Sequence, residues 1–128
     1  MPYNLQNEPS GLGVLISFFG FVKGDEIYDL NEKLLLNKSF SEWRYQIWDF
    51  SNIESSEISL DQVKKFAIQD SVAAQKAPNQ RVAIIPPRYR RSHLDRVFHI
   101  YEEIWGGYES KSFSDIDSAR EWAENGSK

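Results

Sequence analysis

The sequence predicts an α/β fold, a single domain with a mainly parallel sheet of four or five strands and four crossover helices. Short β-like apolar runs alternate four times with longer amphipathic helical patterns, and no long loop separates them. The length of 128 residues suits one domain, 1–128, with its core at about 11–124. Hydrophobic residues make up 41% of the chain, so enough apolar surface is present for a buried core.

The predicted strands are short apolar segments bounded by turn residues. The segment 13–19 is continuously apolar, which is typical of a strand covered on both faces, and 20–24 is predicted to turn the chain. Further strands are predicted over 43–50, 81–85 and 108–113. The stretch before Gly11 is predicted to add a short edge strand at most, because Pro2 and Pro9 limit its pairing.

A helical pattern follows each of these strands. The first helix is predicted to begin near Asp25, and Ser59 to Gln62 matches a capping box that opens the second. Ser114 is predicted to cap the last helix. The clearest helical stripe lies between Ser92 and Gly106 and consists of Leu94, Val97, Phe98, Tyr101, Ile104 and Trp105.

The residue types argue against the common catalytic chemistries. The chain has no cysteine, which excludes disulfides, thiolate catalysis and cysteine-bound zinc. His93 and His99 lie six residues apart on a predicted helix and therefore face different sides. No dinucleotide-binding glycine motif, P-loop or nucleophile elbow is present. We therefore predict a protein that is not an enzyme and has no metal or cofactor.

The net charge and the hydropathy of the chain indicate which partners and which cellular location to expect. The net charge of −4 argues against a general nucleic-acid binder. The apolar run 12–22 is too short to span a bilayer, and the polar first ten residues do not resemble a signal peptide. These features predict a cytoplasmic protein with no nucleic-acid partner and no membrane span.

Three segments resemble the SpoIIAA-like, or STAS-like, family of small α/β proteins. They are GLGVLISFFGFVKGDEIYDL, then IWDFSNI, and finally RVAII with an arginine-rich turn and the tail FSDIDSAREWA. The match covers nearly the whole chain, and the order and spacing of the segments give it its weight. The resemblance implies right-handed crossovers between parallel strands. It also implies a regulatory or protein-interaction role of the kind that stand-alone members of this family have.

The resemblance singles out Ser59. In the classical regulators of this family a partner kinase phosphorylates a serine at the start of the helix after the Asp-Leu-Ser strand. Counted without gaps from Asp49, that position is Ser59, although Glu57-Ile58-Ser59-Leu60 replaces the family's Asp-Ser-Ser-Gly stretch. The helix end could accept a phosphate, whereas a purely structural N-cap role, worth about 1 kcal/mol, is the favoured interpretation.

The second candidate site is a basic turn after the third strand. Residues 81–96 hold five arginines against Asp95, a local charge of +4, while the ten basic and 18 acidic residues elsewhere give −8. Arg88, Arg90 and Arg91 follow a strand at the edge where α/β sheets bind ligands, so an anion or an acidic partner is one interpretation. A solvated turn that pairs with Glu54 or Glu57 is the other. Asp49 is a candidate for the same anion or partner site. It could also serve as a base, but is predicted rather to turn the loop after its strand by accepting amides from Ser51 and Asn52.

These observations lead to two functional hypotheses. The first is a non-enzymatic regulatory or protein-interaction module with an unknown protein partner. The alternative is a carrier for an anionic or lipid-like small molecule at the Arg88–Arg91 edge, which would need a pocket of several hundred Å³. The sequence leaves the oligomeric state open, with a homodimer as one option.

Overall fold

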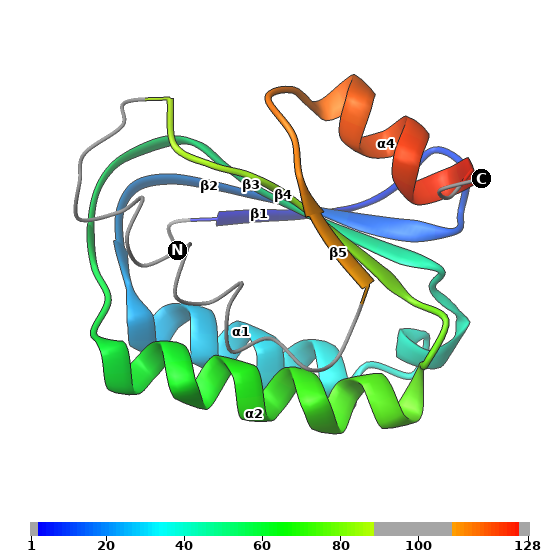
Figure 1. Ribbon diagram of the computed structural model, residues 1–128, viewed down its shortest axis with the longest axis horizontal. Helices are drawn as coiled ribbons and strands as arrows, with labels where there is room; N and C mark the ends of the chain where they lie inside the picture. Colours follow the sequence, from blue (N-terminus) through cyan, green and yellow to red (C-terminus); the bar gives the residue numbers. More distant parts are fainter. Residues whose placement is uncertain (1–2, 89–108, 126–128) are drawn as a thin grey trace.

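The computed structural model describes residues 3–88 and 109–125, which form a five-stranded sheet with helices on both faces (Figure 1). The strands are β1 (Tyr3–Asn7), β2 (Gly13–Lys23), β3 (Tyr45–Glu57), β4 (Arg81–Ile85) and β5 (Glu109–Ser112). The described helices are α1 (Gly24–Leu36), α2 (Leu60–Lys76), α4 (Ile116–Asn125) and a 3-10 turn at Phe40–Glu42. The predicted α/β fold is confirmed, and the helix predicted within 92–105 lies outside the described residues.

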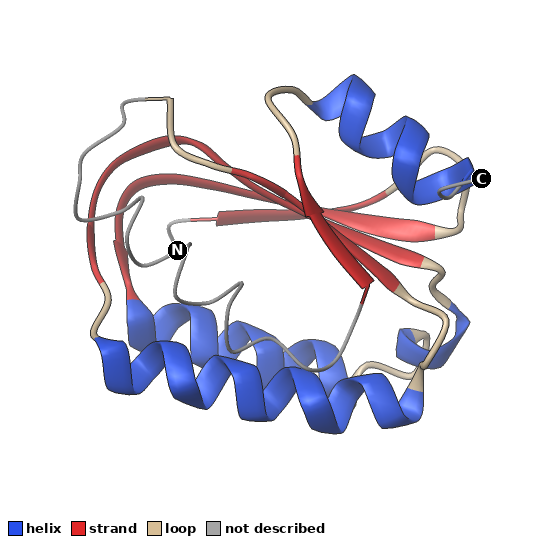
Figure 2. Cartoon of the chain, in the orientation of Figure 1, coloured by secondary structure: helices blue, strands red, loops and turns tan. Residues whose placement is uncertain are grey.

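The strands lie side by side in the order β1-β2-β3-β4-β5. β1 runs antiparallel to β2, and the other neighbours are parallel. α1 and α2 connect parallel strands and cover one face, while α4 packs on the opposite face (Figure 2). α4 follows the last strand and joins no two strands, so the prediction that all four helices are crossover helices is wrong.

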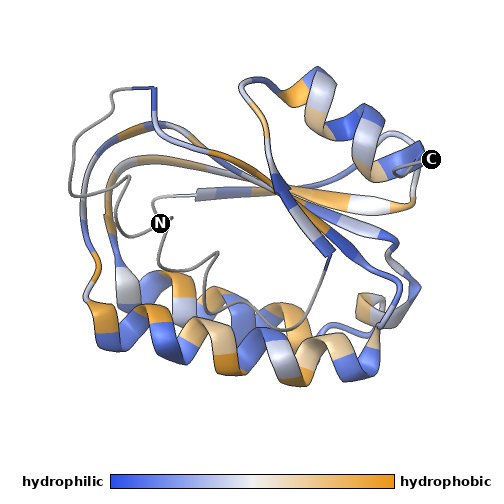
Figure 3. Cartoon of the chain, viewed as in Figure 1, coloured by the Kyte–Doolittle hydropathy of each residue, from blue (hydrophilic) through white to orange (hydrophobic). Residues whose placement is uncertain are grey.

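Hydrophobic side chains fill the space on both faces of the sheet. The larger core lies toward α1 and α2, which alternate hydrophilic and hydrophobic residues along their length (Figure 3). Its centre is Phe18, whose ring stacks on Phe50 with centroids 4.6 Å apart. The smaller core lies under α4 and includes Ala119 and Ala123. The small side chains of these two alanines let the helix lie close to the strands.

β2 and β3 extend well beyond β4, and the sequence did not predict this. Ser17 pairs with Asp49, Phe19 with Asn52, and Phe21 with Ser55, so β3 carries two extra residues along this stretch. Such bulges bend a strand and increase its twist. The two strands accordingly curve away from the sheet toward the starts of α1 and α2 (Figure 1).

Two predicted turns are therefore wrong. The segment 20–24 was expected to turn the chain, but residues 20–23 continue β2, and Gly20 takes a φ of 68° within the strand. The strand predicted over 43–50 begins at Tyr45 and continues to Glu57. In both places a glycine or a Ser-Asn pair resembles a turn locally, whereas pairing with the neighbouring strand keeps the backbone extended.

The helix starts follow the local capping signals closely. At α2 the Ser59 hydroxyl accepts from the Gln62 amide, and the Gln62 side chain accepts in return from the Ser59 amide. At α4 the cap is Asp115 and not Ser114 as predicted, because Asp115 accepts from the Ser118 amide at 2.7 Å. This hydrogen bond lowers the pKa of Asp115. A carboxylate at this position also favours the positive end of the helix dipole.

Candidate functional site

The part of β2 and β3 that extends past the sheet exposes two aromatic rings. We call residues 19–23 of β2 and 52–57 of β3 the β2–β3 ribbon. Phe18 and Val22 point into the core, so Phe19 and Phe21 face the other side of the strand. These two side chains are 43% and 46% exposed. The Lys23 ammonium lies 5.9 Å from the centre of the Phe21 ring.

The ribbon ends where the first turns of α1 and α2 lie together. The Gln62 side chain, which closes the capping box of α2, also donates to Asp25 in the first turn of α1 at 3.0 Å. Gly24 leaves the room for this contact, since a Cβ there would collide with the Gln62 side chain. Ser59 thus lies exposed at this junction with its hydroxyl engaged as the N-cap.

The surroundings of Ser59 are acidic. Glu57 and Asp61 flank it in sequence and are exposed, and Asp25 is joined to the same capping box through Gln62. A phosphate carries a charge of about −1.5 to −2, so these carboxylates would oppose it. The helix amides would favour it, by an amount of a similar order. Phosphorylation of Ser59 stays a prediction, whereas its N-cap contacts are present in the structure.

The N-cap role of Ser59 can be separated from a regulatory one by two substitutions. Ser59→Ala is expected to lower the free energy of unfolding by about 0.5–2 kcal/mol, because it removes the acceptor for the Gln62 amide. Ser59→Asp is expected to stay close to the wild type, since aspartate caps helices about as well as serine. Urea unfolding measures both changes. Equal losses in the two variants would contradict the capping role.

Asp49 lies inside β3 and not at a strand end. It pairs with Ser17 of β2 and with Ile85 of β4, and its side chain is buried. Its carboxylate accepts from the Ser51 amide at 2.9 Å, one of the two amides predicted, and thereby supports the bulge between Asp49 and Asn52 that precedes the ribbon. This contact gives Asp49 a structural role that needs no substrate.

The basic turn begins beside this bulge. The Arg88 amide donates to the Ser51 carbonyl at 3.5 Å, so Arg88 follows β4 at the carboxyl edge, and it is exposed. Arg90 and Arg91 lie outside the described residues. Arg88 and Asp49 are thus both near Ser51, whereas Ser59 lies at the far end of the ribbon. The candidate residues belong to two separate places, and an anion site at the arginines stays a prediction.

A cavity lies between the sheet and the helices α1 and α2. Its volume is about 60 Å³, below the several hundred Å³ of typical sites for drug-sized ligands. It is lined mainly by apolar side chains, with Asn31, Gln46 and Asp70 as polar exceptions. Gln46 is held in place, since it accepts from the Trp48 indole and donates to Gln80.

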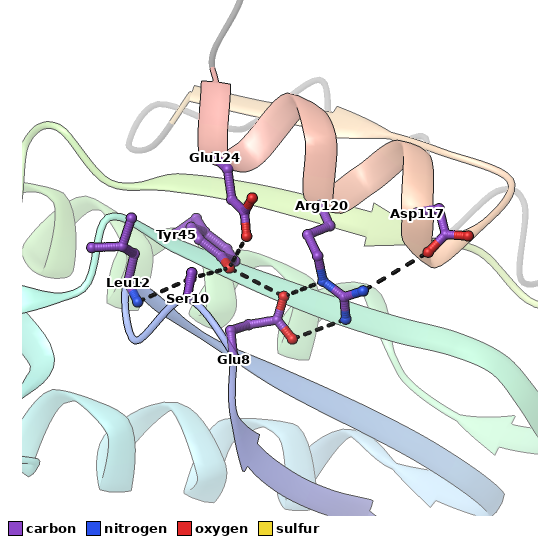
Figure 4. A network of polar contacts seen from close by, with 7 residues as sticks. All are labelled: Glu8, Ser10, Leu12, Tyr45, Asp117, Arg120 and Glu124. Atoms are coloured by element: carbon purple, nitrogen blue, oxygen red, sulfur yellow. Dashed lines mark hydrogen bonds and ion pairs between the residues drawn. The ribbon is translucent and has the colours of Figure 1, made fainter.

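A partly buried polar network, with Glu8 and Tyr45 at its buried centre, joins the opposite end of the sheet to α4 (Figure 4). Glu8 accepts two hydrogen bonds from the Arg120 guanidinium, at 2.6 and 3.1 Å. The Tyr45 hydroxyl lies 3.1 Å from Glu8, 3.1 Å from Glu124 and 3.0 Å from Ser10. Burial, together with the Glu8 charge, raises the pKa of Tyr45. Every polar group here has a partner within the protein, so the network serves to attach α4.

The described part of the chain contains neither a metal-binding group nor a membrane-spanning helix. Residues 3–88 and 109–125 contain no group of three histidine, cysteine or acidic side chains that could hold a metal ion. Among the same residues, no helix has the length and apolar character needed to cross a membrane.

Comparisons with known proteins fit this geometry. No family model matches the sequence, and a search of curated proteins finds no match either. Among solved structures, the anti-sigma factor antagonist SpoIIAA in its unphosphorylated form matches with a TM-score of 0.61 over 98% of this chain and 99% of that one. The chain has a SpoIIAA-like fold.

A second solved structure shows the same fold. An uncharacterized protein of the DUF3478 family from Shewanella loihica PV-4, also with a SpoIIAA-like fold, matches with a TM-score of 0.51 over 94% of this chain and 91% of that one. The sequence identities are 11% for SpoIIAA and 18% for the Shewanella protein. At these identities the likeness concerns the fold, and the function has to be argued from the residues.

Sequence reasoning missed the aromatic rings on the ribbon. The apolar run 13–19 predicts a strand covered on both faces up to Phe19, because hydrophobicity alone cannot show where a strand leaves the sheet. The available signal was the spacing of Phe19 and Phe21. Two large apolar residues at i and i+2 lie on one face of any strand, next to Lys23 on that same face.

Proposed function

We propose that this protein is a non-enzymatic regulatory module that binds a protein partner through the β2–β3 ribbon. The observation that carries the proposal is the exposure of Phe19 and Phe21 on one face of a strand whose other face is buried. Aromatic side chains are enriched in the parts of protein interfaces that contribute most to affinity. The SpoIIAA-like fold supports the proposal, because the neighbour SpoIIAA is an anti-sigma factor antagonist.

The chemistry around the two rings indicates the kind of partner. Lys23 lies next to Phe21, and the exposed Glu54 and Glu57 lie on the neighbouring strand. A complementary surface would therefore have an apolar centre with charged residues of both signs at its rim. The proposed setting is the cytoplasm, in keeping with a chain that has no cysteine.

Binding by a purified partner tests the proposal. A partner identified by cross-linking in cells is purified, and its affinity is measured by calorimetry against the wild type and the double variant Phe19→Ser, Phe21→Ser. We expect the double variant to bind at least ten-fold more weakly, since losing an anchoring aromatic ring costs about 2 kcal/mol or more. Both rings are half exposed, so the fold is expected to persist.

A matched control uses an apolar residue elsewhere. Leu36 at the end of α1 is 80% exposed, so Leu36→Ser removes exposed apolar surface without touching the ribbon. This variant is expected to bind like the wild type. A partner that binds the double ribbon variant and the wild type equally well would overturn the ribbon as the interface.

The alternative of an anionic or lipid-like ligand at Arg88, Arg90 and Arg91 stays a prediction. Arg88 is exposed at the carboxyl edge, which suits an anion, but the small cavity lies on the face covered by α1 and α2 and is lined mainly by apolar side chains. We therefore place the partner-binding hypothesis first.

A further inference from the structure

Within Tyr3–Asn7, the outer edge of β1 lacks the charges, proline and bulges that commonly prevent a strand from pairing with another chain. Edge strands are commonly protected by charged residues, proline or bulges. β1 reads YNLQN, with no charge and no proline, and its register with β2 is regular from Tyr3 to Asn7. At the other edge of the sheet, β5 is shorter and carries Glu109 and Lys111. The two edge strands thus differ in charge, since only β5 carries charged residues.

The hydrogen bonding of β1 shows which of its backbone groups point outward. The Glu8 amide donates to the Gly13 carbonyl at 2.9 Å, just past the end of the β1–β2 register. In an antiparallel pair the residues alternate between facing the neighbouring strand and facing away. Gln6 and Asn4 therefore face β2, whereas the N–H and C=O groups of Tyr3, Leu5 and Asn7 point away from it. Among the described residues, no strand pairs with these outward groups.

A second copy of the same strand fits this edge. If two β1 strands meet antiparallel around a two-fold axis at Leu5, then Leu5 faces Leu5 and Tyr3 faces Asn7. Each of these facing pairs exchanges two backbone hydrogen bonds. Asn4 then lies opposite Gln6, so amide side chains face each other and no like charges meet. Leu5, which is 45% exposed in the single chain, gains an apolar neighbour.

We propose that two copies of this chain associate through β1, edge to edge, so that their sheets join into one continuous sheet across a two-fold axis. The assembly leaves the β2–β3 ribbon free, because the ribbon belongs to the part of β2 beyond Phe18, where β1 pairing ends. A dimer would thus present two copies of the proposed partner site.

The absence of cysteine from the chain permits a direct test by cross-linking. In a hydrogen-bonded antiparallel pair the facing Cα atoms are about 5.5 Å apart, which a disulfide can bridge. Leu5→Cys is therefore expected to form a covalent dimer of twice the 14.9 kDa chain mass under mild oxidation. Asn7→Cys is the matched control. It is exposed on the same strand but faces Tyr3, so two such residues are about 14 Å apart and should not cross-link.

A second measurement follows the monomer–dimer equilibrium directly, without a disulfide cross-link. Leu5→Pro removes an outward N–H and no β1–β2 hydrogen bond, so it is expected to weaken dimerisation at least ten-fold in sedimentation equilibrium while the thermal midpoint of a dilute sample changes little. Leu5→Val keeps the N–H and should dimerise like the wild type. A wild type that is monomeric up to millimolar concentration, or Leu5→Cys that cross-links no faster than Asn7→Cys, would overturn the proposal.

Discussion

Replacing Phe18 by alanine is expected to lower the free energy of unfolding by about 3–5 kcal/mol, which approaches the total stability of many small domains. Phe18 is 1% exposed and contacts three other rings. Its centroid lies 4.6 Å from Phe50, 5.7 Å from Trp48 and 5.9 Å from Tyr3. Truncation would leave a void at the place where β1, β2 and β3 share one core, so the transfer and cavity costs add.

The neighbouring residue supplies the control for this prediction. Phe19→Ala removes the same group from the next position, but on the exposed face of the strand, and it is expected to cost less than about 1 kcal/mol. Urea unfolding followed by tryptophan fluorescence measures both. If Phe19→Ala were as destabilising as Phe18→Ala, the assignment of the two faces of β2 would be wrong, and with it the proposed exposed site.

Much of the fold could be predicted because its signals are local. The strand predicted over 81–85 coincides with β4, and the helix predicted to begin near Asp25 starts at Gly24. The capping box at Ser59 follows from four consecutive residues, and the structure shows both of its hydrogen bonds. In each case the residues that determine the element lie within it.

The predictions from the sequence fail where contacts with distant parts of the chain determine the local structure. Ser51 and Asn52 resemble a turn, yet pairing with β2 extends β3 through them, and the Asp49–Ser51 hydrogen bond becomes part of a bulge. The exposure of Phe19 follows from the same extension. No local pattern shows that one strand extends beyond its neighbour, so the spacing of Phe19 and Phe21 places their rings on one face but does not show that this face is exposed.

The contact between Glu8 and Arg120 is an extreme case of this kind, because 112 residues separate its two partners. Glu8 directly follows β1 and has a side chain that is 2% exposed, while Arg120 lies on α4. The hydrogen bonds that Arg120 donates to the Glu8 carboxylate raise the pKa of the guanidinium. Asp117 approaches the same guanidinium at 3.8 Å from the solvent side.

Glu8→Ala is therefore expected to lower the free energy of unfolding by about 2–3 kcal/mol. It removes the buried carboxylate that accepts two hydrogen bonds from Arg120 and lies 3.1 Å from the Tyr45 hydroxyl. Removing one member of a fully buried pair costs about 3–5 kcal/mol, and the expected loss here is smaller because Arg120 is partly exposed and can be hydrated.

Asp117→Ala provides the contrast, since it removes an exposed carboxylate from the same guanidinium and is expected to cost less than about 0.5 kcal/mol. Arg120→Ala and the double variant with Glu8→Ala complete a cycle, in which the double loss should fall well short of the sum of the single losses. Chemical unfolding measures all four proteins. Strictly additive losses would show that Glu8 and Arg120 act independently, and their ion pair would then not be what holds α4 on the sheet.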